Sequence, residues 1–225
     1  NGHHAFCGMI VSGKSTLLQT LFYGLIHKYA PDYVNLYAID FSSHMLSAFE
    51  HAPHTGGVIY EDDQEKMEKF FHMMEQTLEE RKKLFKGGNY SQFVRANGVK
   101  VPAIIVAIDN YANFREKTDN KYEDVVLHLA HDGVGYGIFL AITAGGFGSS
   151  EIQSKVGDNI KTVLCLQMND KFQYADAMRV PRIETLPESN IKGRGLAKVG
   201  ERILEFQTAL SLEAEDDYQR MEEIE

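Results

Sequence analysis

Residues 8–15 constrain this chain more than any other stretch, because they read Gly-Met-Ile-Val-Ser-Gly-Lys-Ser. The pattern G-x-x-x-x-G-K-[ST] forms a loop whose backbone N–H groups surround the phosphates of a nucleotide. Its lysine, Lys14, brings a positive charge to the β- and γ-phosphates, and its last hydroxyl, on Ser15, is a ligand for Mg²⁺. The pattern predicts a site for ATP and Mg²⁺ formed by Gly8, Ser12, Gly13, Lys14, Ser15 and Thr16.

The residues on either side of the loop support this prediction. Residues 5–7 form a short apolar run typical of a buried strand, and residues 15–30 carry leucine and phenylalanine at helical spacing without a proline. This arrangement places a bound anion at the N-terminus of a helix, where the backbone dipole favours negative charge. The middle of the loop, residues 9–11, is bulkier and more apolar than the small residues common in such loops. We expect a stiff or occluded loop.

Apolar runs alternate with amphipathic helical segments along most of the chain. Ser43 is expected to cap the first helix after the loop helix. The alternation predicts an α/β fold with a parallel, twisted sheet and helices on both faces. Further strands are predicted at residues 34–41, 101–109, 137–143 and 162–168, and residues 53–60 as a turn that leads into a short strand. Helices are predicted at 44–51, 62–86, 122–131 and 152–160.

The C-terminal part departs from this alternation. Residues 193–198 and 202–207 are typical of a β-hairpin that turns at Gly200 and Glu201. The last residues are rich in carboxylates and predict a solvated acidic helix. These patterns divide the chain into a main domain, residues 1–210, and an acidic tail, residues 211–225.

Composition restricts the class of protein further. The 225 residues are 44% hydrophobic, enough for one large core, and the net charge of −9 argues against a large nucleic-acid-binding surface. Cys7 and Cys165 both lie in apolar, strand-like runs and are expected to be reduced core residues. No run approaches the roughly 20 apolar residues of a membrane span, and no signal peptide is evident. The chain begins without Met and reads as a module of a longer polypeptide.

A phosphate loop needs a second carboxylate for the Mg²⁺ shell, and Asp109 ends the most apolar strand-like run. Right-handed crossovers would place its strand beside the loop strand, although an aspartate here also suits a strand end that caps a turn. The next residue, Asn110, stands where strong ATPases of this build carry an acid that polarises the attacking water. An amide orients water but accepts no proton, and losing a general base typically costs about 10²–10⁴ in rate. Thr143, at the end of the next strand, either contacts the γ-phosphate or attacking water, or only packs.

Few arginines are placed to reach a nucleotide. Arg179, Arg182 and Arg194 are each interpreted as surface or ion-pair residues rather than as residues that act on a neighbouring subunit. The nine histidines show no metal-binding spacing.

Four segments together resemble one family, the FtsK/SpoIIIE-type ATPase modules. They are the phosphate loop, residues 36–41 (Leu-Tyr-Ala-Ile-Asp-Phe), residues 53–58 (Pro-His-Thr-Gly-Gly-Val) and the strand that ends at Asp109. The second and third segments are most similar to those of the EssC/EccC coupling proteins of type VII secretion. The resemblance spans about residues 3–210 and implies a RecA/FtsK-like P-loop NTPase fold. EssC/EccC coupling proteins carry three such modules in tandem behind a membrane anchor, so this resemblance implies a soluble module at the cytoplasmic face of the bacterial cell membrane.

Two departures from the working pattern of this family imply a degenerate module. Asn110 replaces the family's acidic residue, and Val163 stands where active motor modules have the arginine of Asn-Ile-Pro-Thr-Arg. The resemblance then places this chain as the third, C-terminal ATPase module, with weak or no hydrolysis. In the family that module is implicated in receiving the C-terminal secretion signal of small helical-hairpin (WXG100-like) substrates, beside the neighbouring modules that it regulates.

Two other functions stay open. A competent ATPase motor would need an arginine from a partner subunit, in an assembly such as a hexamer, but assembly supplies no carboxylate at position 110. A DNA translocase module, the other branch of the resemblance, is disfavoured by the net charge and the lack of a basic stripe. The methionine and phenylalanine stripe of the long helix is most simply core packing, but a Met-rich surface can also hold a partner helix. On that second reading a substrate helix or a neighbouring module docks on the long helix, with Met67, Met73 and Met74, and on residues 89–94, with Tyr90 and Phe93.

Overall fold

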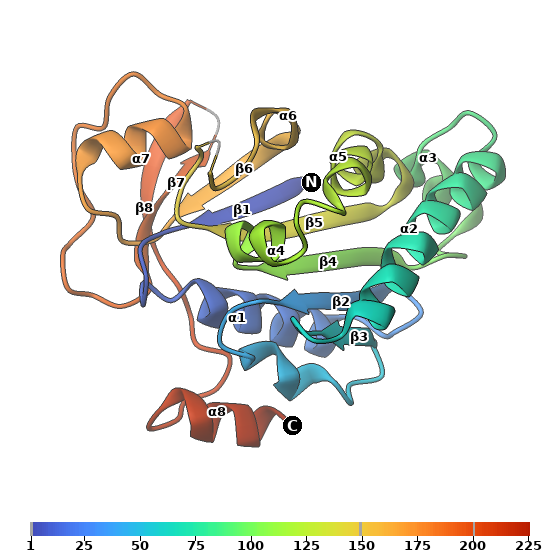
Figure 1. Ribbon diagram of the computed structural model, residues 1–225, viewed down its shortest axis with the longest axis horizontal. Helices are drawn as coiled ribbons and strands as arrows, with labels where there is room; N and C mark the ends of the chain where they lie inside the picture. Colours follow the sequence, from blue (N-terminus) through green and yellow to red (C-terminus); the bar gives the residue numbers. More distant parts are fainter. Residues whose placement is uncertain (1, 149, 200) are drawn as a thin grey trace.

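The computed structural model describes residues 2–148, 150–199 and 201–225. In this part of the chain eight strands form one sheet, and Figure 1 shows helices packed on both of its faces. The strands are β1 (His3–Cys7), β2 (Val34–Asp40), β3 (Thr55–Ile59), β4 (Ala103–Asp109), β5 (Ile138–Ala144), β6 (Ile160–Cys165), β7 (Arg194–Val199) and β8 (Arg202–Gln207). The helices are α1 (Lys14–Lys28), α2 (Gln64–Phe85), α3 (Tyr90–Asn97), α4 (Tyr111–Lys117), α5 (Glu123–Asp132), α6 (Ser154–Gly157), α7 (Lys171–Met178) and α8 (Asp217–Ile224), with short 3₁₀ helices η1 (Met45–Phe49) and η2 (Gly133–Tyr136).

The strands lie in the order β3-β2-β4-β5-β1-β6-β7-β8. The first six positions are parallel, whereas β7 pairs antiparallel with both β6 and β8. The predicted parallel sheet and C-terminal hairpin are confirmed, although Gly200 of the predicted turn lies outside the described residues. The expectation that the strand of Asp109 adjoins the loop strand is wrong. The chain after β4 crosses through α4 and α5 and places β5 between β4 and β1.

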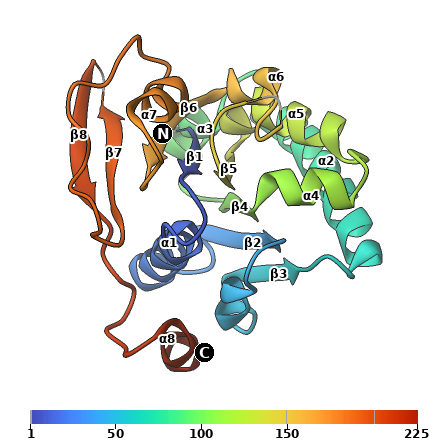
Figure 2. The same ribbon diagram turned by 60° about the vertical axis from the view of Figure 1, so that its left-hand side comes forward.

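Each face of the sheet has its own apolar layer. Figure 2 shows, in a turned view, the helices that lie over the two faces. The larger layer lies under α2, α4, α5 and α7, where Phe71 stacks on Tyr122 with 4.5 Å between ring centroids. The smaller layer lies under α1 and η1, where Phe22 meets Phe49 edge to face. Cys7 and Cys165 are buried in the core, as predicted, and neither is in a disulfide. The parallel strands are therefore covered on both faces, which explains their continuous apolar sequences.

Three short helices escaped prediction, and each begins at a side-chain cap. Asn89 caps α3 in a reciprocal pair with Gln92, Asn110 caps α4, and Asp170 caps α7. The predicted helix over 152–160 shrinks to α6, and the predicted strand over 162–168 begins earlier, at Ile160. The register of β6 is set by β1, since Cys165 lies opposite Cys7.

The methionine stripe of the long helix is core, not an open groove. Met67 and Met74 on α2 are each 1% exposed and pack in the larger layer, and Met73 is half-buried against it. The prediction that these methionines offer a docking surface is therefore wrong for Met67 and Met74. The apolar face of α2 is already used to cover the sheet.

The acidic tail returns to the domain instead of extending into solvent. Thr20 on α1 donates its hydroxyl to the carbonyl of Ala209 at 2.7 Å, and Met221 and Ile224 of α8 pack against the smaller apolar layer. The predicted helix is present and most of its carboxylates are exposed, but it is solvated on one side only, because these apolar residues, three apart, give α8 one face to bury. Within the described ranges no helix is long and apolar enough to cross a bilayer.

Candidate nucleotide-binding site

The phosphate loop connects β1 to α1, as the motif requires. A Cβ on Gly8 would collide with the hydroxyl of Ser12, and Gly13 begins α1 with φ of 98°, so both glycines are needed for the path of the backbone. Ser12 Oγ is buried and lacks a hydrogen-bond partner among the described residues. An unpartnered buried hydroxyl in an anion cradle fits a phosphate oxygen that the chain itself does not supply.

The tip of the loop is exposed. Ile10 is 86% and Val11 83% exposed, and Val11, a β-branched residue, has φ of 65°. The expectation of an occluded loop is wrong. The left-handed backbone at Val11 stores strain in the loop.

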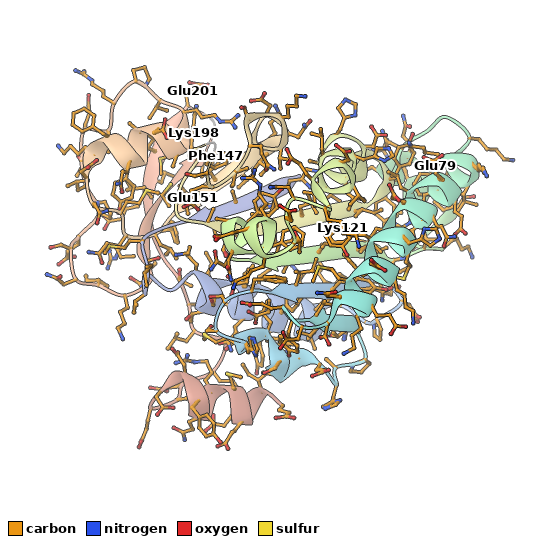
Figure 3. All side chains as sticks on the ribbon, viewed as in Figure 1. Glu79, Lys121, Phe147, Glu151, Lys198 and Glu201 are labelled. Carbon is orange, nitrogen blue, oxygen red and sulfur yellow. The ribbon has the colours of Figure 1, made fainter. Side chains whose placement is uncertain are left out.

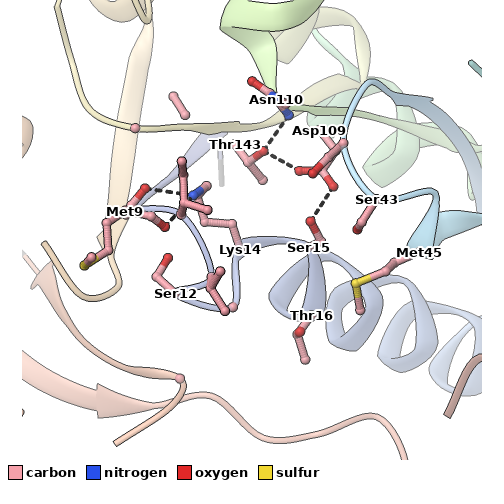
Figure 4. A pocket seen from close by; sticks show the side chains of 18 of the residues that line it. Met9, Ser12, Lys14, Ser15, Thr16, Ser43, Met45, Asp109, Asn110 and Thr143 are labelled. Carbon is pink, nitrogen blue, oxygen red and sulfur yellow. Dashed lines mark hydrogen bonds between the residues drawn. The ribbon is translucent and has the colours of Figure 1, made fainter. Parts of the chain in front are cut away.

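Lys14 lies folded over the loop. Its Nζ donates to the carbonyls of Gly8 at 2.7 Å and Met9 at 2.8 Å, as Figure 4 shows. Burial lowers the pKa of the Lys14 ammonium, and the negative charge of Asp109 opposes that shift. The two carbonyls hold the ammonium at the loop, from which it can turn to a phosphate.

A chain of short hydrogen bonds runs beside Lys14 along the carboxyl ends of the parallel strands, here called the C-terminal edge of the sheet (Figure 4). Ser15 Oγ donates to Asp109 Oδ2 at 2.6 Å, and Thr143 Oγ1 donates to Asp109 Oδ1 at 2.5 Å. The backbone N–H of Asn110 in turn donates to Thr143 Oγ1 at 2.8 Å. Burial raises the pKa of Asp109, and the bonds from Ser15 and Thr143 oppose that rise. The structure thus brings Ser15, Asp109 and Thr143 together. It does so although β5 lies between β4, which ends at Asp109, and β1, which leads through the phosphate loop to Ser15.

Asn110 is used differently from the other predicted residues. Its backbone is left-handed, with φ of 61°, and its side-chain oxygen accepts the N–H of Asn113 at 3.3 Å. That bond caps the first turn of α4. The amide oxygen is engaged in structure at the position where the sequence analysis expected it to orient water.

These residues line a single cavity of about 1660 Å³. Gly8, Ser12, Gly13, Lys14, Ser15 and Thr16 of the loop, and Asp109, Asn110 and Thr143 of the strand ends, all border it. The opposite wall comes from the hairpin and the tail, with Lys192, Gln207, Thr208, Leu210, Asp217 and Arg220. The cavity is large enough for a nucleotide. The strand ends contribute hydroxyls and a carboxylate to its lining, and the tail contributes Asp217 and Arg220.

The three arginines considered from sequence lie outside this cavity. Arg179 pairs with Asp158 and Arg182 with Glu184, while Arg194 contacts Glu205 and Gln207. Val163, at the position of the arginine of active modules, is 7% exposed within β6 and packs in the larger apolar layer.

Sequence reasoning missed two polar residues beside the site. Asp40 is fully buried at the end of β2 and accepts backbone N–H groups of Ser42, His44 and Leu46, so it holds the turn that was assigned to a Ser43 cap. Glu151 lines the cavity and accepts the N–H of Gly145 at 2.8 Å. The signal for Asp40 was present, because an aspartate after a strand commonly accepts N–H groups of the following turn.

The fold and the site together define a P-loop ATPase module. A family profile described as FtsK/SpoIIIE family matches residues 1–181. The chain is 30% identical over its whole length to the ESX secretion system protein EccC of Geobacillus thermodenitrificans, of which it covers 15%. A solved structure of EssC (ATPases 2 and 3) from the same organism aligns with a TM-score of 0.85 at 29% identity, over 99% of this chain and 42% of that one. EccC (ATPases 2 and 3) of Thermomonospora curvata, in complex with a signal sequence peptide, aligns with a TM-score of 0.81 at 24% identity, over 99% of this chain and 41% of that one.

The chain belongs to the FtsK/SpoIIIE family and is homologous to the ATPase modules of the type VII secretion proteins EccC and EssC. It spans about one seventh of the length of the EccC relative that it matches.

Proposed function

We propose that this chain is a nucleotide-binding, weakly hydrolysing module of a membrane-anchored type VII secretion ATPase. One observation carries the proposal. The groups that would hold nucleotide and Mg²⁺ are assembled around Asp109, but the residue in the place of the catalytic acid, Asn110, caps α4 instead. The arrangement therefore supports nucleotide binding, but it provides no carboxylate at position 110 for rapid hydrolysis.

The residues present fit Mg·ATP. Ser15 Oγ and Asp109 Oδ2, 2.6 Å apart, are oxygen groups of the kind that Mg²⁺ prefers in phosphate loops. Lys14 supplies the positive charge toward the β- and γ-phosphates, and Ser12 has a buried hydroxyl to donate. The bound metal ion would neutralise phosphate charge, while these side chains orient the nucleotide.

Weak hydrolysis follows from what the site does not offer to an attacking water. Asn110 accepts no proton, and Val163 leaves position 163 without the arginine of active modules. An arginine supplied by a neighbouring subunit is worth about 10³–10⁵ in rate for related enzymes, so assembly, for example as a hexamer, would restore only that part.

The position within the longer protein is also part of the proposal. The relatives contain tandem modules, named ATPases 2 and 3, and one of them was solved with a signal sequence peptide. With Asn110 as the mark of degeneracy, we assign this chain as the third module, at the cytoplasmic face of the cell membrane. There it would bind the C-terminal signals of helical-hairpin export substrates and regulate the neighbouring modules.

The first test is calorimetric titration of the chain with ATP and ADP, with and without Mg²⁺. We expect Lys14→Ala to weaken ATP binding by about 100-fold, equivalent to about 2.7 kcal/mol, with unchanged stability. Lys161→Ala, at an exposed lysine on β6, is the matched control and should bind like the wild type. Equal affinities of the Lys14 variant and the wild type would refute the nucleotide site.

The second test addresses degeneracy and docking. Wild-type turnover at several per second, in the ordinary range of P-loop enzymes, would contradict the weakly hydrolysing assignment. Titration with a C-terminal peptide of a helical-hairpin export substrate should show saturable binding. No binding at millimolar peptide, with binding by the tandem protein, would move the docking site to another module.

A further inference from the structure

One carboxylate at the phosphate end of the cavity has no role in the site described above. Glu151 follows β5, the strand that carries Thr143, and borders the same cavity as Lys14. The end of β5 also contacts the phosphate loop directly, since Gly8 N donates to the carbonyl of Ala144 at 3.1 Å. Glu151, labelled in Figure 3, therefore comes from the segment that follows β5, the strand between β4, which ends at Asp109, and β1, which leads to the phosphate loop.

The Glu151 carboxylate is held in place by the backbone. Its Oε2 accepts the N–H of Gly145 at 2.8 Å, and the next residue, Ile152, is 2% exposed and anchors the segment in the core. Gly145 makes this approach possible, because a Cβ at that position would lie 3.0 Å from Glu151 Oε1 and 3.1 Å from its Cδ. The N–H of Gly145 thus positions the half-buried carboxylate, and a side chain at position 145 would crowd that carboxylate.

Glu151 also acts electrostatically on the phosphate-binding lysine. Its negative charge is among the groups that raise the pKa of Lys14 against the effect of burial. In phosphate loops this lysine contacts the β- and γ-phosphates. Glu151 and Lys14 border the same cavity, so the Glu151 carboxylate lies beside the space that the attacked end of the nucleotide would occupy.

The other carboxylates of the cavity are placed elsewhere. Glu61 follows β3, four strands away from β1 in the sheet, is exposed, and its Oε1 accepts the side-chain N–H of Asn113 at 3.1 Å. The exposed Asp176 lies on α7, and the exposed Glu215 precedes α8. Asp216 caps α8, and Asp217 pairs with Arg220 on the tail wall. Besides Asp109, Glu151 is therefore the carboxylate among the described cavity residues that is both held by a backbone N–H and placed after β5.

From this geometry we infer that Glu151 supplies the carboxylate that position 110 lacks and acts as the general base for the slow hydrolysis of ATP. The oxygen of a water molecule bonds to the γ-phosphorus, and the bond from that phosphorus to the β–γ bridging oxygen breaks, so that ADP leaves with the electron pair. Glu151 takes the proton of the attacking water and then releases it to solvent. The inference rests on the proposed nucleotide site and adds a catalytic residue to it.

Glu151→Gln tests the inference, because the amide oxygen still accepts the Gly145 N–H while the charge and the basicity are lost. Two readouts are needed: phosphate release in a single turnover with the chain in excess over ATP, and calorimetric affinities for ADP and the non-hydrolysable analogue AMPPNP. We expect phosphate release to fall at least about 100-fold. We expect AMPPNP to bind at least about threefold more tightly, since a negative charge near its γ-phosphate is removed, with ADP unchanged.

Two further variants complete the experiment. Gly145→Ala should move both readouts in the same direction as Glu151→Gln but by less, because a Cβ at 3.0 Å from Oε1 shifts the carboxylate by a few tenths of an ångström. Glu61→Gln, which removes a carboxylate from another part of the cavity rim, should leave both unchanged. A wild-type chain that binds AMPPNP but releases no phosphate, or a Glu151→Gln variant with wild-type turnover, overturns this inference and leaves nucleotide binding intact. A wild-type chain that binds no nucleotide overturns the proposed function itself, and this inference with it.

Discussion

The edge of the sheet formed by the carboxyl ends of the parallel strands and the edge formed by their amino ends differ in how buried polar side chains are bonded. At the first, the C-terminal edge, Ser15, Asp109 and Thr143 bond to one another, side chain to side chain, although Asp40 there accepts backbone N–H groups. At the N-terminal edge, the buried side chains of Arg81 and His3 bond to the backbone. Side-chain partners can rotate toward a ligand, whereas backbone partners of a folded sheet cannot.

The Arg81 guanidinium acts as a clamp on the N-terminal edge. It donates to the carbonyls of Tyr136 at 2.8 Å, Gly137 at 3.2 Å and Pro102 at 2.6 Å, so it joins α2 to the segments that lead into β4 and β5. The ring of Tyr90 lies 5.9 Å from the guanidinium carbon. With 5% exposure, this arginine is committed to the fold.

This difference separates stability from function within one sheet. Groups at the N-terminal edge should affect unfolding and leave nucleotide binding alone, and groups at the C-terminal edge should do the reverse. The variants below test the separation, starting with the largest expected effect.

Arg81→Met should cost about 3 kcal/mol or more in the free energy of unfolding, because it leaves three carbonyls without their charged donor in a buried site. Denaturant unfolding followed by circular dichroism measures the loss. Lys83→Met, at an exposed position on the same helix, should change stability by less than about 0.5 kcal/mol. The affinity of folded Arg81→Met for ATP should equal that of the wild type. A large loss of affinity would show that the two edges are coupled.

His3 should make stability depend on pH. Its ring bonds the carbonyl of Ala130 at 3.0 Å and accepts the N–H of Leu140 at 2.9 Å, and burial lowers its pKa to about 4. Between about pH 4 and 6.5 the unfolded chain therefore binds more protons than the folded chain, so stability is full above that window and falls as the pH is lowered through it. The slope should approach about 1.4 kcal/mol per pH unit.

Urea unfolding of the wild type and of His3→Gln across this range measures the slope. Burial also lowers the pKa of His4, so the difference between the two proteins isolates the contribution of His3. The exposed His72, changed to Gln, is the control and should leave the pH dependence as in the wild type. A wild-type slope retained in His3→Gln would assign the effect to other groups.

The C-terminal edge was more predictable from sequence than the N-terminal edge, for a physical reason. The phosphate loop is one continuous segment, and Asp109 and Thr143 end apolar strands whose C-terminal ends meet at one edge of a parallel sheet. Local pattern and topology together are enough to place them. Arg81, by contrast, lies on a helix face that periodicity treats as part of an amphipathic stripe, and its three carbonyl partners are distant in sequence.

Other residues of the site depended on packing that the sequence does not display. The capping role of Asn110 follows from the left-handed turn into α4, a helix that was not predicted. Glu151 reaches the cavity only because its segment turns back to the N–H of Gly145. The burial of Met67 and Met74 was one of two readings of the same helical stripe, and only the position of α2 on the sheet decides between them.

The smallest expected effect concerns Asn110. This residue borders the site at the C-terminal edge, but its side chain stabilises the fold, as the buried side chains of the N-terminal edge do. Asn110→Ala should cost about 1 kcal/mol in the free energy of unfolding, because it removes the cap of α4. Asn110→Asp, an equally good cap that also tolerates the left-handed backbone, should stay within about 0.5 kcal/mol of the wild type. Because the side chain at this position bonds to Asn113 N, the added carboxylate should leave ATP hydrolysis close to the wild-type rate. Denaturant unfolding and phosphate release on the same samples decide the point. A tenfold or larger rise in the rate of phosphate release by Asn110→Asp would mean that the general base acts from position 110. Asn110 would then be better described as the replacement of a catalytic carboxylate than as a helix cap.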